Sequence, residues 1–273
     1  MSGPVSHEKR VPATPSASVI LARDGDEGLE ILMVRRHRDT AFGSADAFPG
    51  GRLSEGDRQV HALCDGIEAD DANRRLNLDA GGLDFYSAAI RELFEEVGVL
   101  LARCEPAQDF VVDLAASDDE ALVPRRIELA AGKLAWPQFL RERGLVLAVD
   151  TLHYISHWEA PVDFWPRFST RFFVAVAPPA QQVQCDGCEI VDSRWVSPAR
   201  ALRMGRNGDL RLPFPTLKHV ELLAEFSSLA ELIHWARDRW KVGIPRIRGV
   251  RVTENGKLRT LLPGDAGYPE DEV

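Results

Sequence analysis

The sequence predicts an α/β fold, because strand-like segments and amphipathic helices occur together in a chain of ordinary globular composition. Strand-like runs occupy residues 16–36 and 171–196, and a helical pattern with marked ends lies between them at residues 85–97. Apolar residues make up 45% and charged residues 27% of the 273 residues, which argues against wholesale disorder and against a fibrous repeat. We therefore expect a mixed sheet packed between helices.

The first expected element is a β-hairpin. Residues 16–23 and 29–36 are strand-like and flank a turn-rich link, Asp24-Gly-Asp-Glu-Gly28. The turn Ala47-Phe-Pro-Gly-Gly51 follows, and its glycines allow the backbone to approach a ligand closely. The polar, acidic stretch after it, with an inserted part at about residues 58–83, is expected to be an insertion or a long loop.

A helix is expected from about Phe85 to Val97, with Asp84 as its cap and Gly98 as a left-handed stop. The remaining expectations are a flexible lead at 1–15, a helical insert at about 103–160, strands at 171–177 and 189–196, a helix opening at 197–202, two helices between 215 and 239, and a hairpin tail at about 245–268 with Asn255-Gly256 as its turn. These segments form a single domain from residue 16 to 273.

Charge and apolar patterning exclude several classes of protein. The chain has 33 Lys and Arg against 42 Asp and Glu, a net charge of −9, which argues against a nucleic-acid partner. No run approaches the ~18–20 apolar residues of a membrane span, and the N-terminal residues lack the apolar core of a secretory signal. Four cysteines and a C-terminus, Asp271-Glu272-Val273, without a peroxisomal tripeptide lead us to expect a cytoplasmic protein.

Cys185-Asp-Gly-Cys188 is a CxxC pair with three interpretations. A zinc site would need a second pair of ligands, and His153 and His157 are spaced like ligands but lie in an aromatic stretch. A redox pair is the second interpretation. A tight turn built on Asp-Gly is the one we favour.

The helix at residues 90–97 carries a concentrated acidic face. At 100° per residue its apolar side chains share one face, and Glu92, Glu95 and Glu96 gather on the opposite one. Like charges at this spacing destabilise a helix, and only Arg91 can offset them, through Glu95. The face is either a solvated charge run or a site for a divalent cation such as Mg²⁺ or Mn²⁺, which prefers carboxylate oxygens, waters and substrate phosphates.

The glycine turn and the acidic helix together resemble the Nudix box, Gly-x5-Glu-x7-Arg-Glu-U-x-Glu-Glu-x-Gly-U, where U is apolar. Residues 91–99, Arg-Glu-Leu-Phe-Glu-Glu-Val-Gly-Val, match its second half at every specified position, and Gly51 matches its start. Asp57 stands where the family has Glu, and it lies 34 residues before Arg91 rather than 8, so that 26 residues are inserted.

The split box is similar to that of one branch of the family, the RP2-like coenzyme A diphosphatases that include mammalian Nudix 19. Residues 47–53, 169–173 and 262–265 are also similar to that branch. The resemblance implies a Nudix α/β/α sandwich with a mixed sheet, enlarged by insertions. It covers about residues 16 to 268.

The resemblance also implies the roles of the box residues. Glu92, Glu95 and Glu96 would hold Mg²⁺ or Mn²⁺, with the Gly51 carbonyl as a further ligand. Glu92 or Glu95 would take the proton of the attacking water, and Arg91 would orient the carboxylates. Asp57 either contacts metal through water or only holds the loop.

Residues outside the box complete the expected site. Glu189 is the candidate for an additional base or metal ligand, with a surface strand residue as the alternative. Arg36, Arg167 and Arg171 could bind phosphates through their planar guanidinium groups, unless they are solvated charges. Phe48 could stack on adenine, unless it belongs to the core.

The resemblance implies hydrolysis of a diphosphate linkage in a nucleoside-diphosphate-linked small molecule. Coenzyme A or acyl-coenzyme A, cleaved to 3′,5′-ADP and phosphopantetheine or its acyl form, is the leading substrate. The alternatives are ADP-ribose, NADH or a nucleotide sugar, or a non-catalytic Nudix domain that senses a nucleotide. A homodimer paired through the inserted segments is also expected.

Overall fold

A mixed eight-stranded sheet forms the centre of the protein, described by a computed structural model for residues 12–26, 28–39, 43–104, 122–179, 181–254 and 257–269. Its strands are β1 (Thr14–Gly25), β2 (Gly28–Arg36), β3 (Asp46–Ala47), β4 (Gly50–Arg52), β8 (His153–Glu159), β9 (Phe168–Val176), β10 (Ile190–Val196) and β11 (Arg246–Arg248). The strand order is β10-β2-β1-β9-β8-β11, with β3 paired to β2 and β4 paired to β1. The expected hairpin is present as β1 and β2, which pair antiparallel, whereas β1 and β9 pair parallel.

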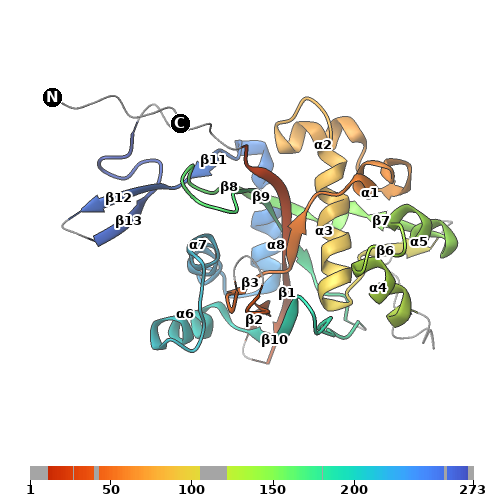
Figure 1. Cartoon of the computed structure of the whole chain (residues 1–273), viewed down its shortest axis with the longest axis horizontal. Coiled ribbons are helices and arrows are strands. Elements are labelled where there is room, and N and C mark those ends of the chain that lie inside the picture. The colour runs from red at the N-terminus through yellow and green to blue at the C-terminus, as the bar shows by residue number, and fades with distance from the viewer. Residues whose placement is uncertain are drawn as a thin grey trace.

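Helices cover both faces of this sheet (Figure 1). Helix α3 (Gly82–Val97) packs on one face, and α6 (Pro198–Asn207), α7 (Phe214–Leu223) and α8 (Leu229–Arg237) pack on the other. Successive side chains of β1 divide between the two layers: Val19 and Leu21 lie in the core with α3, and Ile20 lies in the core with α7 and α8. This arrangement is the α/β/α sandwich that the sequence predicts.

The segment expected to be an insertion or a long loop is a structured insertion. Helix α1 (Glu55–Arg58) leads into it, and it contains the 3₁₀ helix η1 (His61–Leu63), β5 (Cys64–Asp65) and α2 (Ala69–Leu76). Ala72 and Leu76 of α2 are buried in the core that α3 shares. The insertion therefore folds onto the first half of α3, because its few apolar side chains lie at helical spacing.

The segment expected to be a helical insert is mixed. Helices α4 (Leu122–Ala130) and α5 (Trp136–Glu142) are present, and residues 105–121 lie outside the described residues. Strands β6 (Ala102–Cys104) and β7 (Leu145–Ala148) pair with β5 in a three-stranded sheet, and the 3₁₀ helix η2 (Val149–Thr151) follows. The end of the segment is the strand β8, an aromatic-rich run with five of its seven residues buried, and its pairing with β9 overrides the helical expectation.

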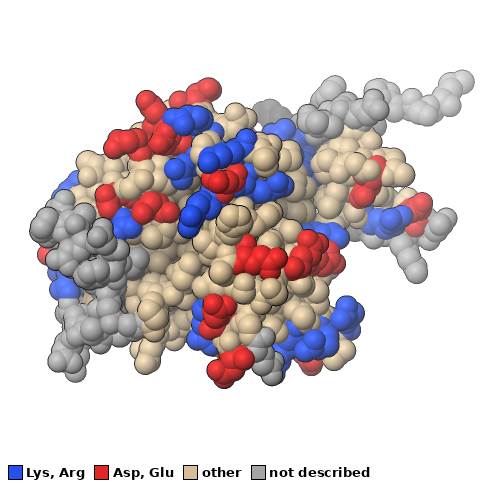
Figure 2. Space-filling model, turned by 180° about the vertical axis from the view of Figure 1, so that it is seen from behind, with Lys and Arg blue, Asp and Glu red and all other residues tan. Residues whose placement is uncertain are grey.

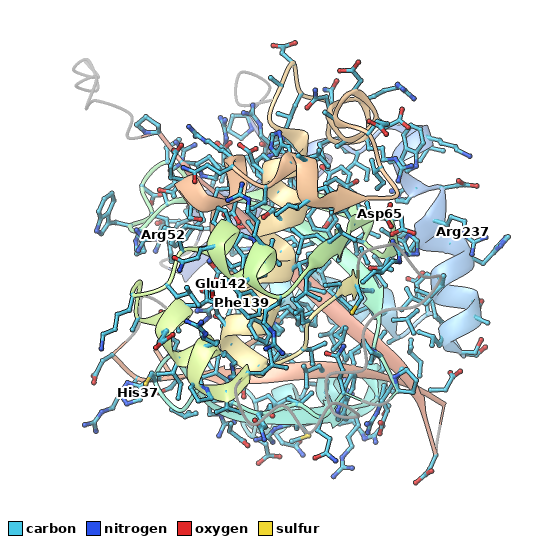
Figure 3. All side chains as sticks on the ribbon, turned by 90° about the vertical axis from the view of Figure 1, so that its right-hand side faces the viewer. His37, Arg52, Asp65, Phe139, Glu142 and Arg237 are labelled. Carbon is cyan, nitrogen blue, oxygen red and sulfur yellow. The ribbon has the colours of Figure 1, made fainter. Side chains whose placement is uncertain are left out.

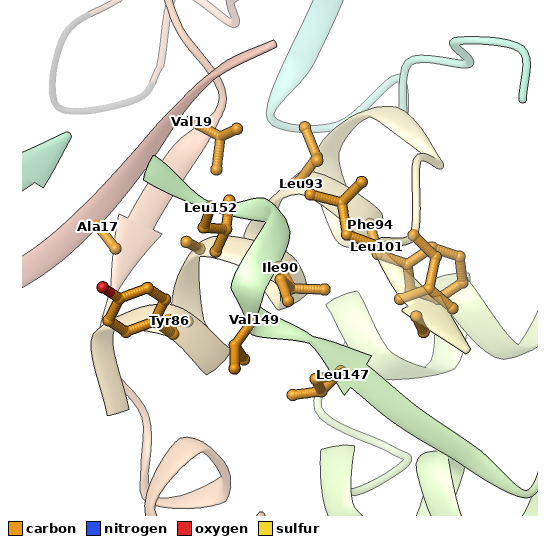
Figure 4. Close-up of a cluster of buried hydrophobic side chains, with 14 of the residues drawn as sticks. Ala17, Val19, Tyr86, Ile90, Leu93, Phe94, Leu101, Leu147, Val149 and Leu152 are labelled. Carbon is orange, nitrogen blue, oxygen red and sulfur yellow. The ribbon is translucent and has the colours of Figure 1, made fainter. Parts of the chain in front are cut away.

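Helix α3 begins at Gly82, three residues before the expected start, and ends at Val97 as expected. Asp84 is not its cap: it lies within the first turn, where its carboxylate binds His61 at 2.6 Å. Gly98 adopts the left-handed conformation, with φ of 75°, that stops the helix. Figure 4 shows Ile90, Leu93 and Phe94 packed among the insert residues Leu147, Val149 and Leu152. The inserted segments therefore share the core that positions α3; the single-domain division stays a prediction.

The C-terminal part ends in the 3₁₀ helix η3 (Arg239–Val242) and the antiparallel hairpin of β12 (Val250–Glu254) and β13 (Lys257–Leu261), which projects from the body in Figure 1. Its expected turn residues, Asn255 and Gly256, lie outside the described residues. Within the described ranges, no helix has the length and apolarity to cross a membrane. On the face seen in Figure 2, Lys and Arg side chains are interspersed with Asp and Glu.

Candidate active site

The glycine turn of β4 lies between β1 and α3. At Gly50 a Cβ atom would lie 2.4 Å from the Ala17 carbonyl oxygen, and φ is +153°. At Gly51 a Cβ atom would lie 2.4 Å from the carboxyl carbon of Glu92. Gly50 has no room for a side chain, and a side chain at Gly51 would displace the Glu92 carboxylate, so the two glycines bring the backbone of the turn directly against the acidic face of α3.

Arg91 lies at the centre of the acidic face and uses all five of its N–H donors. Its Nη1 donates to Glu92 at 2.9 Å and to Glu95 at 3.1 Å. Its Nη2 donates to the Arg52 carbonyl at 2.8 Å, and Nε and Nη2 bind the Asp57 carboxylate at 3.1 and 3.0 Å. One guanidinium group therefore joins the box turn, Asp57 and two of the three box glutamates.

Asp57 is fully buried, and both of its carboxylate oxygens are engaged. Oδ1 accepts from Ser87 Oγ at 2.9 Å and from Arg91. Oδ2 accepts from the Ser54 backbone N–H at 2.7 Å, from Ser54 Oγ at 2.9 Å and from Arg91. With five donors around it, this carboxylate has the environment of a structural anchor. Holding the loop is one of the two roles that the sequence left open for Asp57.

Glu96 is also buried, but its environment is different. Oε2 accepts from the Gly50 backbone N–H at 2.9 Å, and Oε1 lies 3.2 Å from Arg36 Nη2 without a hydrogen-bond geometry. Oε1 is a buried oxygen with no hydrogen-bond donor among the described residues. Arg36 in turn donates to the Gly50 carbonyl at 2.5 Å. Glu96 thus keeps one unsatisfied oxygen directed into the turn.

Burial disfavours the charged forms of the three box glutamates. Burial raises the pKa of Glu95 to about 7 and that of Glu96 to about 8, against the attraction of Arg91 and Arg36, respectively. Burial likewise raises the pKa of Glu92. Desolvation disfavours the charged form, and further positive charge at this place would favour it.

Glu189 lies at the exposed end of the loop that leads into β10. Its carbonyl accepts from the His37 backbone N–H at 2.7 Å, and its charge contributes to the raised pKa values of Glu92 and Glu96. The structure therefore brings Glu189 into the electrostatic environment of the box.

Arg126 of α4 holds the C-terminal end of α3 and was not identified from the sequence. Its Nε donates to the Glu95 carbonyl at 3.0 Å, and its Nη2 donates to the carbonyls of Glu96 and Gln184 at 3.1 and 2.6 Å. A helix leaves its last carbonyls without internal partners, and a buried guanidinium satisfies two of them here. No local pattern in the mixed segment around Arg126 indicates this contact.

Trp136 and Ser87 form a second connection that sequence reasoning missed. Trp136 Nε1 of α5 donates to Ser87 Oγ at 3.0 Å, and Ser87 donates to Asp57. A buried chain of hydrogen bonds thus links α5, in the insert at about residues 103–160, through Ser87 and Asp57 to Arg91.

The four expected substrate-binding residues are held in other contacts. Arg36 belongs to the turn described above. Arg167 is buried and pairs with Glu159, and Arg171 is buried with its guanidinium 4.1 Å from the Phe85 ring centroid. Phe48 is 2% exposed and belongs to the core with α7 and α8. The fold uses these side chains for packing, whereas Arg52, next to Gly51, is exposed.

The box turn and the basic residues around Arg237 lie on different sides of the molecule. In Figure 3, Arg52 and His37 lie toward one side, and Asp65 and Arg237 lie toward the other. A cavity of about 450 Å³ near Arg237 is lined partly by basic side chains, but it belongs to that opposite side. The box turn is therefore the place where acidic side chains and glycine backbone converge.

No group of three or more His, Cys, Asp or Glu in the described part of the chain is already arranged around a common cation position. The reason at the box is Arg91, whose Nη1 lies between Glu92 and Glu95. The CxxC pair likewise has no zinc ligand set among these residues. It forms a turn, with Gly187 at φ of 74°.

Comparisons with known proteins agree with this architecture. A model of the NUDT19 Nudix domain matches residues 77–223. Acyl-coenzyme A diphosphatase NUDT19 of Xenopus laevis is 27% identical, over 89% of this chain and 72% of the relative. The human protein of that name is 30% identical over 68% of this chain and 51% of its own length, so the chain spans about half of that relative. A NUDIX hydrolase from Alicyclobacillus acidocaldarius has the same fold, with a TM-score of 0.65 and 23% identity over 80% of this chain and 94% of the other.

An α/β/α sandwich with an acidic helix against a glycine turn defines the class: the protein is a Nudix hydrolase. The family match covers more than half of the chain, and within the class the protein belongs to the NUDT19 Nudix domain family. It is an enzyme related to proteins named as acyl-coenzyme A diphosphatases, which supports hydrolysis of a diphosphate as its reaction.

Proposed function

We propose that the enzyme hydrolyses the diphosphate of coenzyme A or an acyl-coenzyme A with Mg²⁺ or Mn²⁺ held by the box. The products are 3′,5′-ADP and phosphopantetheine or its acyl form. One observation carries the metal: Asp57, Glu92, Glu95 and Glu96 pair with two guanidinium groups, those of Arg91 and Arg36, and the charge of Glu189 adds to the raised pKa of Glu92 and Glu96. A divalent cation would balance this excess.

The residues present fit such a cation. Glu96 Oε1 is a buried acceptor without a donor among the described residues, and Arg91 contacts one oxygen of Glu92 and one of Glu95, leaving the other oxygen of each beyond its bonds. Carboxylate and carbonyl oxygens are the ligands that Mg²⁺ and Mn²⁺ prefer. We assign Glu92, Glu95 and Glu96 as the ligands, with the Gly51 carbonyl and Glu189 as additional ones.

A bound divalent cation would supply charge neutralisation of the diphosphate and a more acidic water. The chain's own residues do the rest. Glu92 or Glu95 accepts the proton of the attacking water on a carboxylate oxygen. Arg91 orients both carboxylates through a single nitrogen, and Asp57 fixes Arg91, so that neither serves as the base. Exposed Arg52 lies beside the turn and contacts a phosphate oxygen of the substrate.

The coenzyme A substrate is supported by two observations: the box is split at the same point as in the RP2-like branch, and the curated relatives are named as acyl-coenzyme A diphosphatases. ADP-ribose, NADH and nucleotide sugars are the rival substrates, and a silent nucleotide sensor is the rival class. Retention of all three box glutamates favours catalysis over sensing.

A substrate panel tests this proposal. Coenzyme A, acetyl-coenzyme A, ADP-ribose, NADH and a nucleotide sugar are compared with Mg²⁺, with Mn²⁺ and with EDTA, and the products are identified by mass. We expect the highest kcat/KM for coenzyme A or its thioester, with 3′,5′-ADP as a product and no turnover in EDTA. Faster cleavage of another substrate contradicts the substrate, and undiminished turnover in EDTA contradicts the metal.

Two expectations complete the proposal. Pairing of two chains through the inserted segments predicts a dimer, which light scattering in solution measures. A cytoplasmic location is tested by cell fractionation.

A further inference from the structure

The loop that carries Cys185 and Cys188 lies directly against the C-terminal end of α3. The Gln184 backbone N–H donates to the Val97 carbonyl at 2.9 Å, and the Asp186 backbone N–H donates to the Glu96 carbonyl at 3.1 Å. Cys185 lies between these two contacts. The first cysteine of the pair is thus built into the cap of α3.

The second cysteine precedes Glu189, and Asp186 holds this part of the loop. The Asp186 carboxylate accepts from the backbone N–H groups of Glu189 at 2.9 Å and Ile190 at 2.8 Å. The Gly187 backbone N–H donates to the Ile190 carbonyl at 3.1 Å. The chain from Cys185 to Glu189 is therefore one compact turn that connects the Glu96 carbonyl with the acidic residue that we assign to the site.

The two thiols differ in access. Cys188 is exposed, whereas Cys185 is half-buried and packs against the core.

We propose that Cys185 and Cys188 are a regulatory thiol–disulfide site, at which oxidation closes a bond across the turn and lowers the activity of the enzyme. The geometry gives the pair an order of reaction. The exposed Cys188 thiol reacts with the oxidant first, and the half-buried Cys185, three residues away, resolves the intermediate.

Glutathione disulfide is the oxidant with which the step balances. The Cys188 thiolate displaces one glutathione thiol and forms a mixed disulfide. Cys185 then loses its proton, attacks the Cys188 sulfur and releases a second glutathione thiol, leaving the Cys185–Cys188 disulfide. Two protein thiols are oxidised, one glutathione disulfide is reduced, and a dithiol reagent reverses both steps.

The consequence for activity rests on the function proposed above. A disulfide brings its two Cα atoms to about 4.4–6.8 Å, so ring closure constrains the turn around Asp186. The turn is the link between the Glu96 carbonyl and Glu189, and a change in it alters the positions of both acidic residues relative to Arg36 and Arg91. We expect kcat to fall about fivefold or more in the oxidised enzyme.

The test compares the full chain with the variants Cys188→Ser and Cys104→Ser, in reduced and oxidised glutathione. Cys104 is exposed but lies in β6, outside the turn, and serves as the matched control. Activity is first measured under reducing conditions, so that a failure of the proposed function is seen before oxidation begins. The disulfide is located by peptide mass, as a loss of two hydrogen atoms, and amide hydrogen exchange of Glu189 and Ile190 reports the turn without any substrate.

The expected result is a Cys185–Cys188 disulfide and a reversible loss of kcat in the natural sequence and in Cys104→Ser. Cys188→Ser should keep its activity in oxidised glutathione. Failure of the folded protein to form this disulfide overturns the proposal, and so does a formed disulfide that leaves kcat unchanged. If the enzyme shows no diphosphatase activity under reducing conditions, unchanged amide exchange on oxidation overturns it instead.

Discussion

Asp57 and Glu96 are two buried carboxylates of the same box, and their surroundings are opposite. Asp57 receives five hydrogen bonds from Ser54, Ser87 and Arg91. Glu96 receives one backbone hydrogen bond, from Gly50, and keeps an oxygen without a donor within the described residues. Both lie within the reach of a guanidinium group, so charge alone does not distinguish them.

The difference shows how this fold divides its acidic residues between structure and chemistry. A buried charge whose lone pairs are all engaged stabilises the native arrangement, and removing it leaves several donors without partners. A buried carboxylate with an oxygen that accepts no hydrogen bond costs folding energy, and for Glu96 we predict a role in activity rather than in stability. The following changes test this division, from the largest expected effect to the smallest.

Glu96→Gln should lower kcat/KM about a hundredfold or more, the scale of losing a strong electrostatic contact in an active site. The protein should remain folded with undiminished stability, because burial already opposes the charge of Glu96 and raises its pKa to about 8. Steady-state kinetics and urea unfolding measure the two effects. Glu55→Gln, at a carboxylate that is 73% exposed, is the control. A fully active Glu96→Gln would contradict the metal assignment.

Asp57→Asn should mainly lower stability, whereas Glu96→Gln should mainly lower activity. We expect the free energy of unfolding to fall by about 3 kcal/mol. The change breaks a buried ion pair, and it places the NH₂ group of the asparagine against donors that the carboxylate oxygen accepted from. Activity should fall as a consequence, since Arg91 loses its anchor. Urea unfolding measures the stability, with the exposed Asp39→Asn as a control. An Asp57→Asn protein of unchanged stability and no activity would instead place Asp57 among the metal ligands.

Mn²⁺ or Mg²⁺ should raise the unfolding temperature of the natural sequence. A ligand at about one hundred times its Kd adds about 2.7 kcal/mol to the stability of the form that binds it. The rise should disappear in EDTA and be much smaller in Glu96→Gln, whereas Asp57→Asn should retain part of it. Differential scanning fluorimetry at several metal concentrations gives the result, and an equal rise in Glu96→Gln would argue against a site at this carboxylate.

Trp136→Phe should have the smallest effect. An aromatic ring is retained for stacking on Phe139, whose centroid lies 5.7 Å from that of Trp136, but the hydrogen bond to Ser87 is lost and the smaller ring leaves a gap at a buried position. Loss of the hydrogen bond costs about 1 kcal/mol of stability, and the gap adds to this cost. We expect kcat to change less than about twofold. A tenfold fall in kcat would show that the hydrogen-bond chain from α5 controls the position of Arg91.

The sequence predicted the elements that depend on neighbouring residues and missed those that depend on distant ones. Helix α3 and its glycine stop follow from apolar spacing over sixteen residues, and the split box identified the acidic face. Strand β8 was expected to be helical because its pairing with β9 is not visible locally. Arg167 was expected to contact substrate, but its partner Glu159 becomes a neighbour only when β8 and β9 pair.

The sequence by itself determined the acidic face, the glycine turn and the class of enzyme, because these reside in short spacings that a helix or a turn converts directly into geometry. Only the tertiary structure decided which carboxylate is satisfied. Asp57 finds its donors at Ser87 and Arg91, and Glu96 faces Gly50, through contacts between segments at least thirty residues apart. The physical reason is that a buried polar group is defined by its partners, and folding alone brings those partners together.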